Sequence, residues 1–145
     1  TIQHDGKIVV AGYAWIGSND YFALVRYNAD GSLDTSFGTG GKVTTPVGTS
    51  DDFGFSVTLQ PDGKIVVAGQ AWGGSSWDFA LVRYNADGSL DTTFGTAGKV
   101  TTPVGTGSDY GFSVTIQPDG KIVLAGSAYM DYDADFALVR YTADG

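Results

Sequence analysis

The stretch "FALVRYNADGSLDT" occupies residues 22–35, and the same fourteen letters occur again at residues 79–92. A third copy begins at Phe136 and reads "FALVRYTADG" as far as Gly145. The part "FALV" is apolar at consecutive positions, which indicates a β-strand that is buried on both faces. The part "ADGS" has the composition of a tight turn. The chain therefore repeats one strand-and-turn phrase.

The repeat has a period of 57 residues, and about 45 of the first 57 positions are identical in the second unit. One unit of this kind buries its sheet faces only against copies of itself, so the core forms when units stack. We therefore expect a single repeat array over residues 1–145, and further copies of the repeat, in the same protein or in another chain, as its partners. Its units are 1–57, 58–114 and a partial third unit at 115–145.

Each unit is expected to hold four short strands, which in the second unit are residues 53–60, 64–72, 79–85 and 99–105. The fourth strand is rich in threonine and contains Pro103, which suits the edge of a sheet. No segment shows an apolar period of 3.6 residues with caps, so we expect essentially no helix. Four-stranded antiparallel sheets covered on both faces by their neighbours are typical of β-propeller blades. A β-solenoid is the alternative, although its rungs are normally shorter.

The composition excludes several classes of function. The chain has 145 residues, a net charge of −8 and no cysteine, and all of its acidic residues are Asp. This charge disfavours nucleic acid and anionic membranes as partners, and no apolar run is long enough to insert into a membrane as a helix. Because Asp favours turns, most of the acidity is explained by turn chemistry. The only methionine is Met130, so we expect this chain to be an internal piece of a longer protein.

The segment "QPDGKIVVAG", followed by "DFALVRYNADGSLDTTFGTAGKV", resembles the delta-60 repeat of bacterial secreted and surface proteins. The resemblance covers the entire chain. It implies a β-propeller-like architecture and an extracellular or cell-surface location in a bacterium, and it brings no catalytic residues with it. The chain departs from the pattern of its own repeats at His4, where the other units have Pro, and at Tyr21, where they have Asp.

One arginine in each unit lies inside an otherwise apolar strand. A buried cation needs an acidic partner, and turn residues such as Asp34 or Asp91 could supply it. We interpret the set as a recurring structural ion pair, because a catalytic group is usually unique. A ring of guanidinium groups around a central channel is the functional alternative. The arginines are Arg26, Arg83 and Arg140.

The units differ most at residues 13–21, 70–78 and 127–135, which we expect to be loops. Loops on a rigid scaffold often carry binding specificity, and aromatic side chains beside Asp and Ser suit carbohydrate recognition. Loop drift with aromatic packing between units is the other interpretation. The candidate ligand-binding residues are Trp15, Trp72, Trp77, Asp78, Tyr129 and Tyr132.

The sequence offers few signs of a cofactor. Asp131, Asp133 and Asp135 alternate, so on an extended segment they would share a side and could hold a calcium ion weakly; a solvated acidic loop is the simpler interpretation. The "NADGSLD" segment lacks the closing Glu of a calcium loop and is better explained as an Asx-type turn. His4 is alone in a turn, so neither zinc nor a Ser-His-Asp triad is expected.

Three functions follow from these observations. The first is a non-catalytic structural or adhesion module that assembles with itself or with other proteins. The second is a carbohydrate- or peptide-binding module that uses the aromatic loops. The third is a glycoside hydrolase built on Asp pairs, which requires two carboxylates in different environments; Asp residues repeated in equivalent turns do not supply that asymmetry.

Overall fold

The computed structural model describes residues 1–131 and 133–145, and these residues form three antiparallel sheets and no helix. We call the sheets blade 1, blade 2 and blade 3. Blade 1 contains β1 (Ile8–Ile16), β2 (Asn19–Tyr27) and β3 (Lys42–Thr45). Blade 2 contains β4 (Asp52–Leu59), β5 (Ile65–Trp72), β6 (Trp77–Tyr84) and β7 (Lys99–Thr102). Blade 3 contains β8 (Asp109–Ile116), β9 (Ile122–Met130) and β10 (Asp133–Tyr141).

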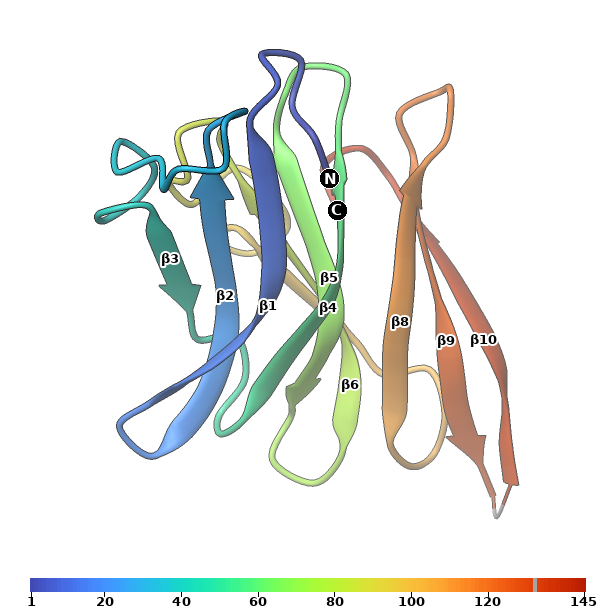
Figure 1. The fold of residues 1–145 in the computed structure, drawn as a ribbon. Helices are drawn as coiled ribbons and strands as arrows, with labels where there is room; N and C mark the ends of the chain where they lie inside the picture. The colour runs from blue at the N-terminus through green and yellow to red at the C-terminus, as the bar shows by residue number, and fades with distance from the viewer. Residues whose placement is uncertain (132) are drawn as a thin grey trace.

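Each blade is a meander in which sequential strands pair, and the three blades stand side by side in chain order (Figure 1). The prediction of an all-β fold of tandem propeller-like blades is confirmed. Among the described residues only blade 2 has four strands. In blade 1 the position of the first strand is marked only by the bridge between Ile2 and Ile8. In blade 3 β10 is an edge strand.

The first strand of blade 2 lies against blade 1, and the first strand of blade 3 lies against blade 2. Both of these strands, β4 and β8, carry a β-bulge at the same place in the repeat, between Gly54 and Ser56 and between Gly111 and Ser113. The backbones of β4 and β5 come very close together at the bulge, since a Cβ on Gly69 would lie 1.8 Å from the Phe53 carbonyl oxygen. Only glycine fits such a close approach.

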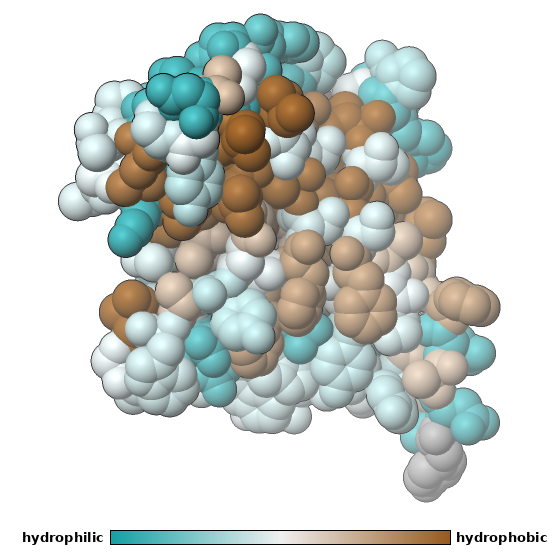
Figure 2. Space-filling view, in the orientation of Figure 1, coloured by the Kyte–Doolittle hydropathy of each residue, from teal (hydrophilic) through white to brown (hydrophobic). Residues whose placement is uncertain are grey.

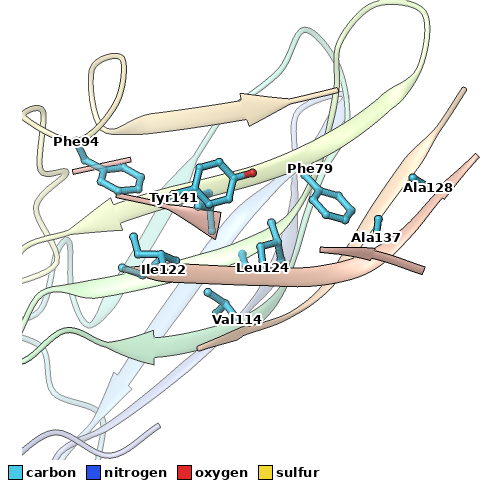
Figure 3. Packing of buried hydrophobic residues seen from close by; sticks show 11 residues of the cluster. Phe79, Phe94, Val114, Ile122, Leu124, Ala128, Ala137 and Tyr141 are labelled. Atoms are coloured by element: carbon cyan, nitrogen blue, oxygen red, sulfur yellow. The ribbon is translucent and has the colours of Figure 1, made fainter. Parts of the chain in front are cut away.

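The core consists of two apolar clusters, one in each space between blades. One cluster joins Val9, Phe22 and Leu24 of blade 1 to the near face of blade 2. The other joins Phe79 and Leu81 of blade 2 to blade 3 (Figure 3). Blade 2 is therefore buried on both faces, as the consecutive apolar residues predicted.

That prediction is wrong for the two terminal blades. Phe79 is 0% exposed, whereas Phe136, the equivalent residue of blade 3, is 102% exposed. Val67 is 0% exposed, whereas Val10 of blade 1 is 49% exposed. The physical reason is that each terminal blade has a neighbour on one face only within the described residues.

The three variable segments are not the loops that we expected. β1 and β2 continue as a hairpin as far as Ile16 and Asn19, and β6 already begins at Trp77. Trp72 and Trp77 are a directly opposed cross-strand pair, with ring centroids 5.4 Å apart. Cross-strand aromatic pairs stabilise a sheet, and this contact explains why the two strands continue up to the borders of the Gly- and Ser-rich segment 73–76.

Candidate functional site

The recurring arginines of blades 1 and 2 lie in a polar network between blades. Arg26 on β2 donates from Nε to Asp34 at 2.8 Å, and Arg83 on β6 donates from Nε to Asp91 at 2.8 Å. Both acceptors belong to the segment that returns from the turn toward the last strand of the same blade. All four of these side chains are almost completely buried.

The same guanidinium groups also reach the next blade. Arg26 Nη1 donates to the carbonyl oxygen of Ala86 at 2.5 Å, and Arg83 Nη1 donates to that of Ala143 at 2.6 Å. The planar guanidinium of Arg83 lies 4.7 Å from the ring centroid of Phe94. Each arginine therefore binds an aspartate of its own blade through Nε and a turn of the next blade through Nη1. We call this arrangement the arginine clamp.

The clamp stabilises the ionised form of its carboxylates. Hydrogen bonds from the Ser36 hydroxyl and from Lys7 hold the pKa of Asp34 well below its usual range, and Arg26 adds an electrostatic contribution. The pKa of Asp91 is lowered in the same way, chiefly by the hydroxyl of Thr93. A carboxylate fixed in its charged form by several donors is suited to structure rather than to proton transfer.

Arg140, the third arginine, has no such network among the described residues. Its side chain is exposed. In blade 2 the side-chain oxygen of Gln60 accepts from Arg83 Nη1 at 3.2 Å. The equivalent oxygen, Oε1 of Gln117, is buried without a hydrogen-bond partner among the described residues. Within the described residues the clamp is therefore complete in blades 1 and 2 but not in blade 3.

The predicted aromatic residues lie near one end of the blades, in three separate settings. Trp72 and Trp77 are half-buried, because they contact each other and the ring of Phe53 packs on Trp77 at 5.1 Å. Trp15 stands 64% exposed on β1. Tyr129 packs edge-on against Tyr110 at 6.4 Å. Tyr132 lies outside the described residues.

Two further features accompany these aromatics. A hollow of about 250 Å³ is lined by Thr106, Gly107, Ser108, Tyr110, Tyr129 and Asp131. Asp78 follows Trp77 on β6, and its partial burial raises the pKa of its carboxyl group, with a smaller contribution from the negative charge of Asp109. The candidate binding residues therefore do not converge on one site: the Trp72–Trp77 pair supports the strand ends, and Trp15 and Tyr129 are the exposed platforms.

The sequence analysis missed a row of aromatic side chains that crosses β1, β4 and β8. Tyr13 packs edge-on to Phe53 at 4.7 Å, and Phe55 lies 6.3 Å from Phe112 of blade 3. Phe55 and Phe112 are 45% and 55% exposed. Figure 2 shows apolar side chains gathered on this face of the molecule, over β1, β4 and β8. The sequence signal that could have indicated this row is the motif "FGF" or "YGF", which places one aromatic residue on each side of the glycine at the bulge.

Two buried carboxylates were also missed. Asp52 and Asp109 are 0% exposed, at the starts of β4 and β8. Asp52 accepts hydrogen bonds from the backbone N–H groups of Val47 and Gly48 at 2.7 and 2.8 Å. Burial raises the pKa of this carboxyl group against the effect of those donors. Asp52 holds the linker between blades 1 and 2 in this way, and Asp109 holds the linker between blades 2 and 3.

The candidate calcium residues occupy different kinds of position. Asp131 lies in the hairpin turn with φ at +59°, and Asp133 and Asp135 lie on β10. In residues 1–131 and 133–145 no three carboxylate or imidazole groups converge to hold a metal ion. The "NADGS" carboxylates are used locally, because Asp30 accepts from the Ser32 backbone and hydroxyl at 2.9 and 2.6 Å. Calcium binding at the third hairpin stays a prediction.

His4 is exposed in a turn, as expected of a loop residue. No helix in the described part of the chain is long and apolar enough to cross a membrane.

Comparison with known families identifies the repeat. A family model described as a domain of unknown function (DUF5122) beta-propeller matches residues 3–37, 60–94 and 117–145. These segments make up more than half of the chain, which therefore belongs to this β-propeller family. A search of curated proteins found no match.

Proposed function

We propose that this chain is a non-catalytic structural module of a bacterial extracellular or cell-surface protein. Its blades pack face to face against further copies of the same repeat. The resemblance to the delta-60 repeat supports the extracellular or cell-surface location, and it is more specific than membership of the β-propeller family. The proposal concerns assembly because every strongly held polar group described above serves a contact within or between blades.

The observation that carries the proposal is the change of exposure at equivalent positions. Phe79 and Leu81 are 0% exposed in blade 2, whereas Phe136 and Leu138 in blade 3 are 102% and 66% exposed. Large apolar side chains gain roughly 1.5–3 kcal/mol each when they are buried. The outer face of blade 3 is thus a copy of a surface that is fully covered one blade earlier.

Sedimentation velocity over a range of concentrations tests the proposal. We expect the chain to self-associate and Phe136→Ser to weaken that association, since the variant removes an apolar contact at the exposed face. Asp62→Ser, at an exposed turn of blade 2, is the matched control and should associate like the parent chain. A well-folded monomer at all concentrations would contradict the proposal.

A second candidate function is carbohydrate or peptide binding at the aromatic end of the blades. The observation that favours it is the exposure of Trp15, at 64%, because a free indole face is a platform for a sugar ring. A glycan array tests it, and Trp15→Ala should abolish any hit. Trp77→Ala is less informative, because Trp77 also supports Trp72 and Phe53.

A further inference from the structure

A continuous row of aromatic rings runs across the three blades. The ring of Tyr13 in blade 1 packs edge-on against Phe53 of blade 2, with centroids 4.7 Å apart. Phe53 stacks with Phe55 of the same strand at 6.3 Å, and Phe55 lies 6.3 Å from Phe112 of blade 3. We call Tyr13, Phe53, Phe55 and Phe112 the aromatic row.

The middle of the row is exposed although both neighbouring blades are present. Phe55 belongs to blade 2, which packs on blade 1 with one face and on blade 3 with the other. Its ring is still 45% exposed, whereas Phe79 of the same blade is 0% exposed. The exposure of this ring is therefore a property of the repeat inside the array.

Contacts within the protein hold the row in place before a ligand binds. Phe53 is fixed by two other strands, because it contacts Tyr13 of β1 and also Trp77 of β6, at 5.1 Å. Phe55 is the extra residue of the β-bulge in β4, and a bulge of this kind re-aims a side chain. A surface that is ordered in advance loses little conformational freedom on binding.

The strands that carry the row present no exposed charge. Residues 53–59 and 110–116 contain no Asp, Lys or Arg. The carboxylates that precede them, Asp52 and Asp109, are 0% exposed and accept hydrogen bonds from the linkers. A ligand that matches this surface is therefore uncharged.

Two features of β4 indicate the class of the ligand. Ser56 Oγ accepts from the Val114 N–H at 3.1 Å, so its own O–H can donate to a ligand beside the Phe55 ring. The bulge interrupts the free edge of β4, and this disfavours an extended peptide, which needs a regular edge for strand pairing. Aromatic rings next to a hydroxyl group suit a ligand with apolar faces and hydroxyl edges, such as a sugar ring.

We propose that the aromatic row binds a neutral linear polysaccharide, whose sugar rings lie along Tyr13, Phe55 and Phe112. The net charge of −8 repels polyanions such as uronic acid polymers, and the row has no cation to offset that repulsion. The inference rests on carbohydrate binding, the second candidate function, and assigns it to the row instead of Trp15. Because the row crosses from blade to blade, a longer oligosaccharide should bind more tightly than a short one.

Affinity electrophoresis tests the proposal on the 145-residue chain. Each gel contains one soluble polysaccharide, either a neutral linear glucan, mannan or xylan or the polyanions polygalacturonate and alginate. We expect at least one neutral polymer to retard the chain and neither polyanion to do so. In calorimetry, the hexasaccharide of the retarding polymer should bind at least about tenfold more tightly than its disaccharide.

Variants of the row identify the contact. Phe55→Ser should weaken hexasaccharide binding at least about tenfold, because the burial of a phenylalanine ring is lost. Phe55→Tyr keeps a ring and should bind like the parent chain. Phe136→Ser is the matched control, because it makes the same change at an exposed phenylalanine outside the row. If Phe55→Ser melts at a lower temperature than the parent chain, Phe112→Ser replaces it.

Four results would overturn the proposal. They are no retardation by any neutral polymer, retardation by the polyanions alone, undiminished binding in the row variants, and row variants that lose self-association in sedimentation velocity while no saccharide binds. The last result would mean that a second copy of the chain covers the row. Binding that Trp15→Ala abolishes and Phe55→Ser retains would refute the row and support the second candidate function, so the two can fail separately.

Discussion

The arginine clamp predicts an asymmetry between its two charges. Arg83 donates to Asp91, to Gln60 and to the Ala143 carbonyl oxygen, and its side chain is 3% exposed. Asp91→Ala leaves this cation buried with neutral hydrogen-bond acceptors, and the nearest remaining carboxylate is that of the exposed Asp144, 3.7 Å from Nη1. Removing one partner from a buried pair costs about 3–5 kcal/mol. We expect Asp91→Ala to lower the free energy of unfolding by that amount.

Arg83→Leu should cost less, about 2–3 kcal/mol, from one charged hydrogen bond and the contact with the Phe94 ring. Asp91 keeps two donors in this variant, since Lys64 Nζ lies 3.2 Å from Oδ2 and the Thr93 hydroxyl lies 2.6 Å from Oδ1. Leucine also refills part of the apolar space. Adding Asp91→Ala to Arg83→Leu should then cost little, so the coupling energy should approach the roughly 3–5 kcal/mol that Asp91→Ala costs alone.

Urea unfolding of the parent, both single variants and the double variant measures this coupling. Arg140→Leu is the matched control, because it makes the same substitution at the exposed copy, and it should change stability by less than about 0.5 kcal/mol. Additive effects would show that Asp91 is not the partner of Arg83. A negligible loss in both single variants would show that the arginine is solvated, and the clamp would be refuted.

Two further predictions concern pH and the closest backbone contact. The pKa values of Asp34 and Asp91 lie below the usual 3.8 in the folded chain. Their ionisation therefore stabilises the fold above about pH 3.8, and this stabilisation is lost as pH falls further. Urea unfolding between pH 7 and pH 2 should show the free energy of unfolding decline, and the decline should be smaller in Asp91→Asn. Gly69→Ala should destabilise by about 1–3 kcal/mol or more, because its Cβ would meet the Phe53 carbonyl oxygen at 1.8 Å. Gly12→Ala, with no atom within 4 Å of the added Cβ, should be neutral, and thermal melts of the two variants beside the parent chain measure the difference.

The architecture could be predicted because the sequence repeats it. Consecutive apolar residues, turn dipeptides and the absence of a helical period each indicated the same strands, and the structure has them within a few residues. The ends of the hairpins could not be predicted. The segment 73–76 has the composition of a loop, and only the contact between Trp72 and Trp77 extends the strands to its borders.

The buried carboxylates could not be predicted for a different reason. Asp52 follows a run of Gly, Thr, Ser and Asp that has the composition of an exposed linker. Its burial depends on the backbone N–H groups of Val47 and Gly48, which face it after the linker folds back. A pattern of residue types along the chain does not contain that geometry. The aromatic row on β4 and β8 escaped notice similarly, because the bulge at Gly54 alters the alternation that would have indicated it.

The three arginines show why repetition predicts side-chain roles only up to the neighbouring blade. Arg83 and Arg140 lie in the same seven-letter phrase, "FALVRYN" and "FALVRYT", and differ in their neighbours only at the final letter. One is held by an aspartate, a glutamine and a carbonyl of the next turn, and the other is exposed. Intrinsic propensity is the same for both, so their different environments come from the return segment and the following blade. The residues of a repeat unit therefore determine what it can contact, and the next unit determines which of those contacts form.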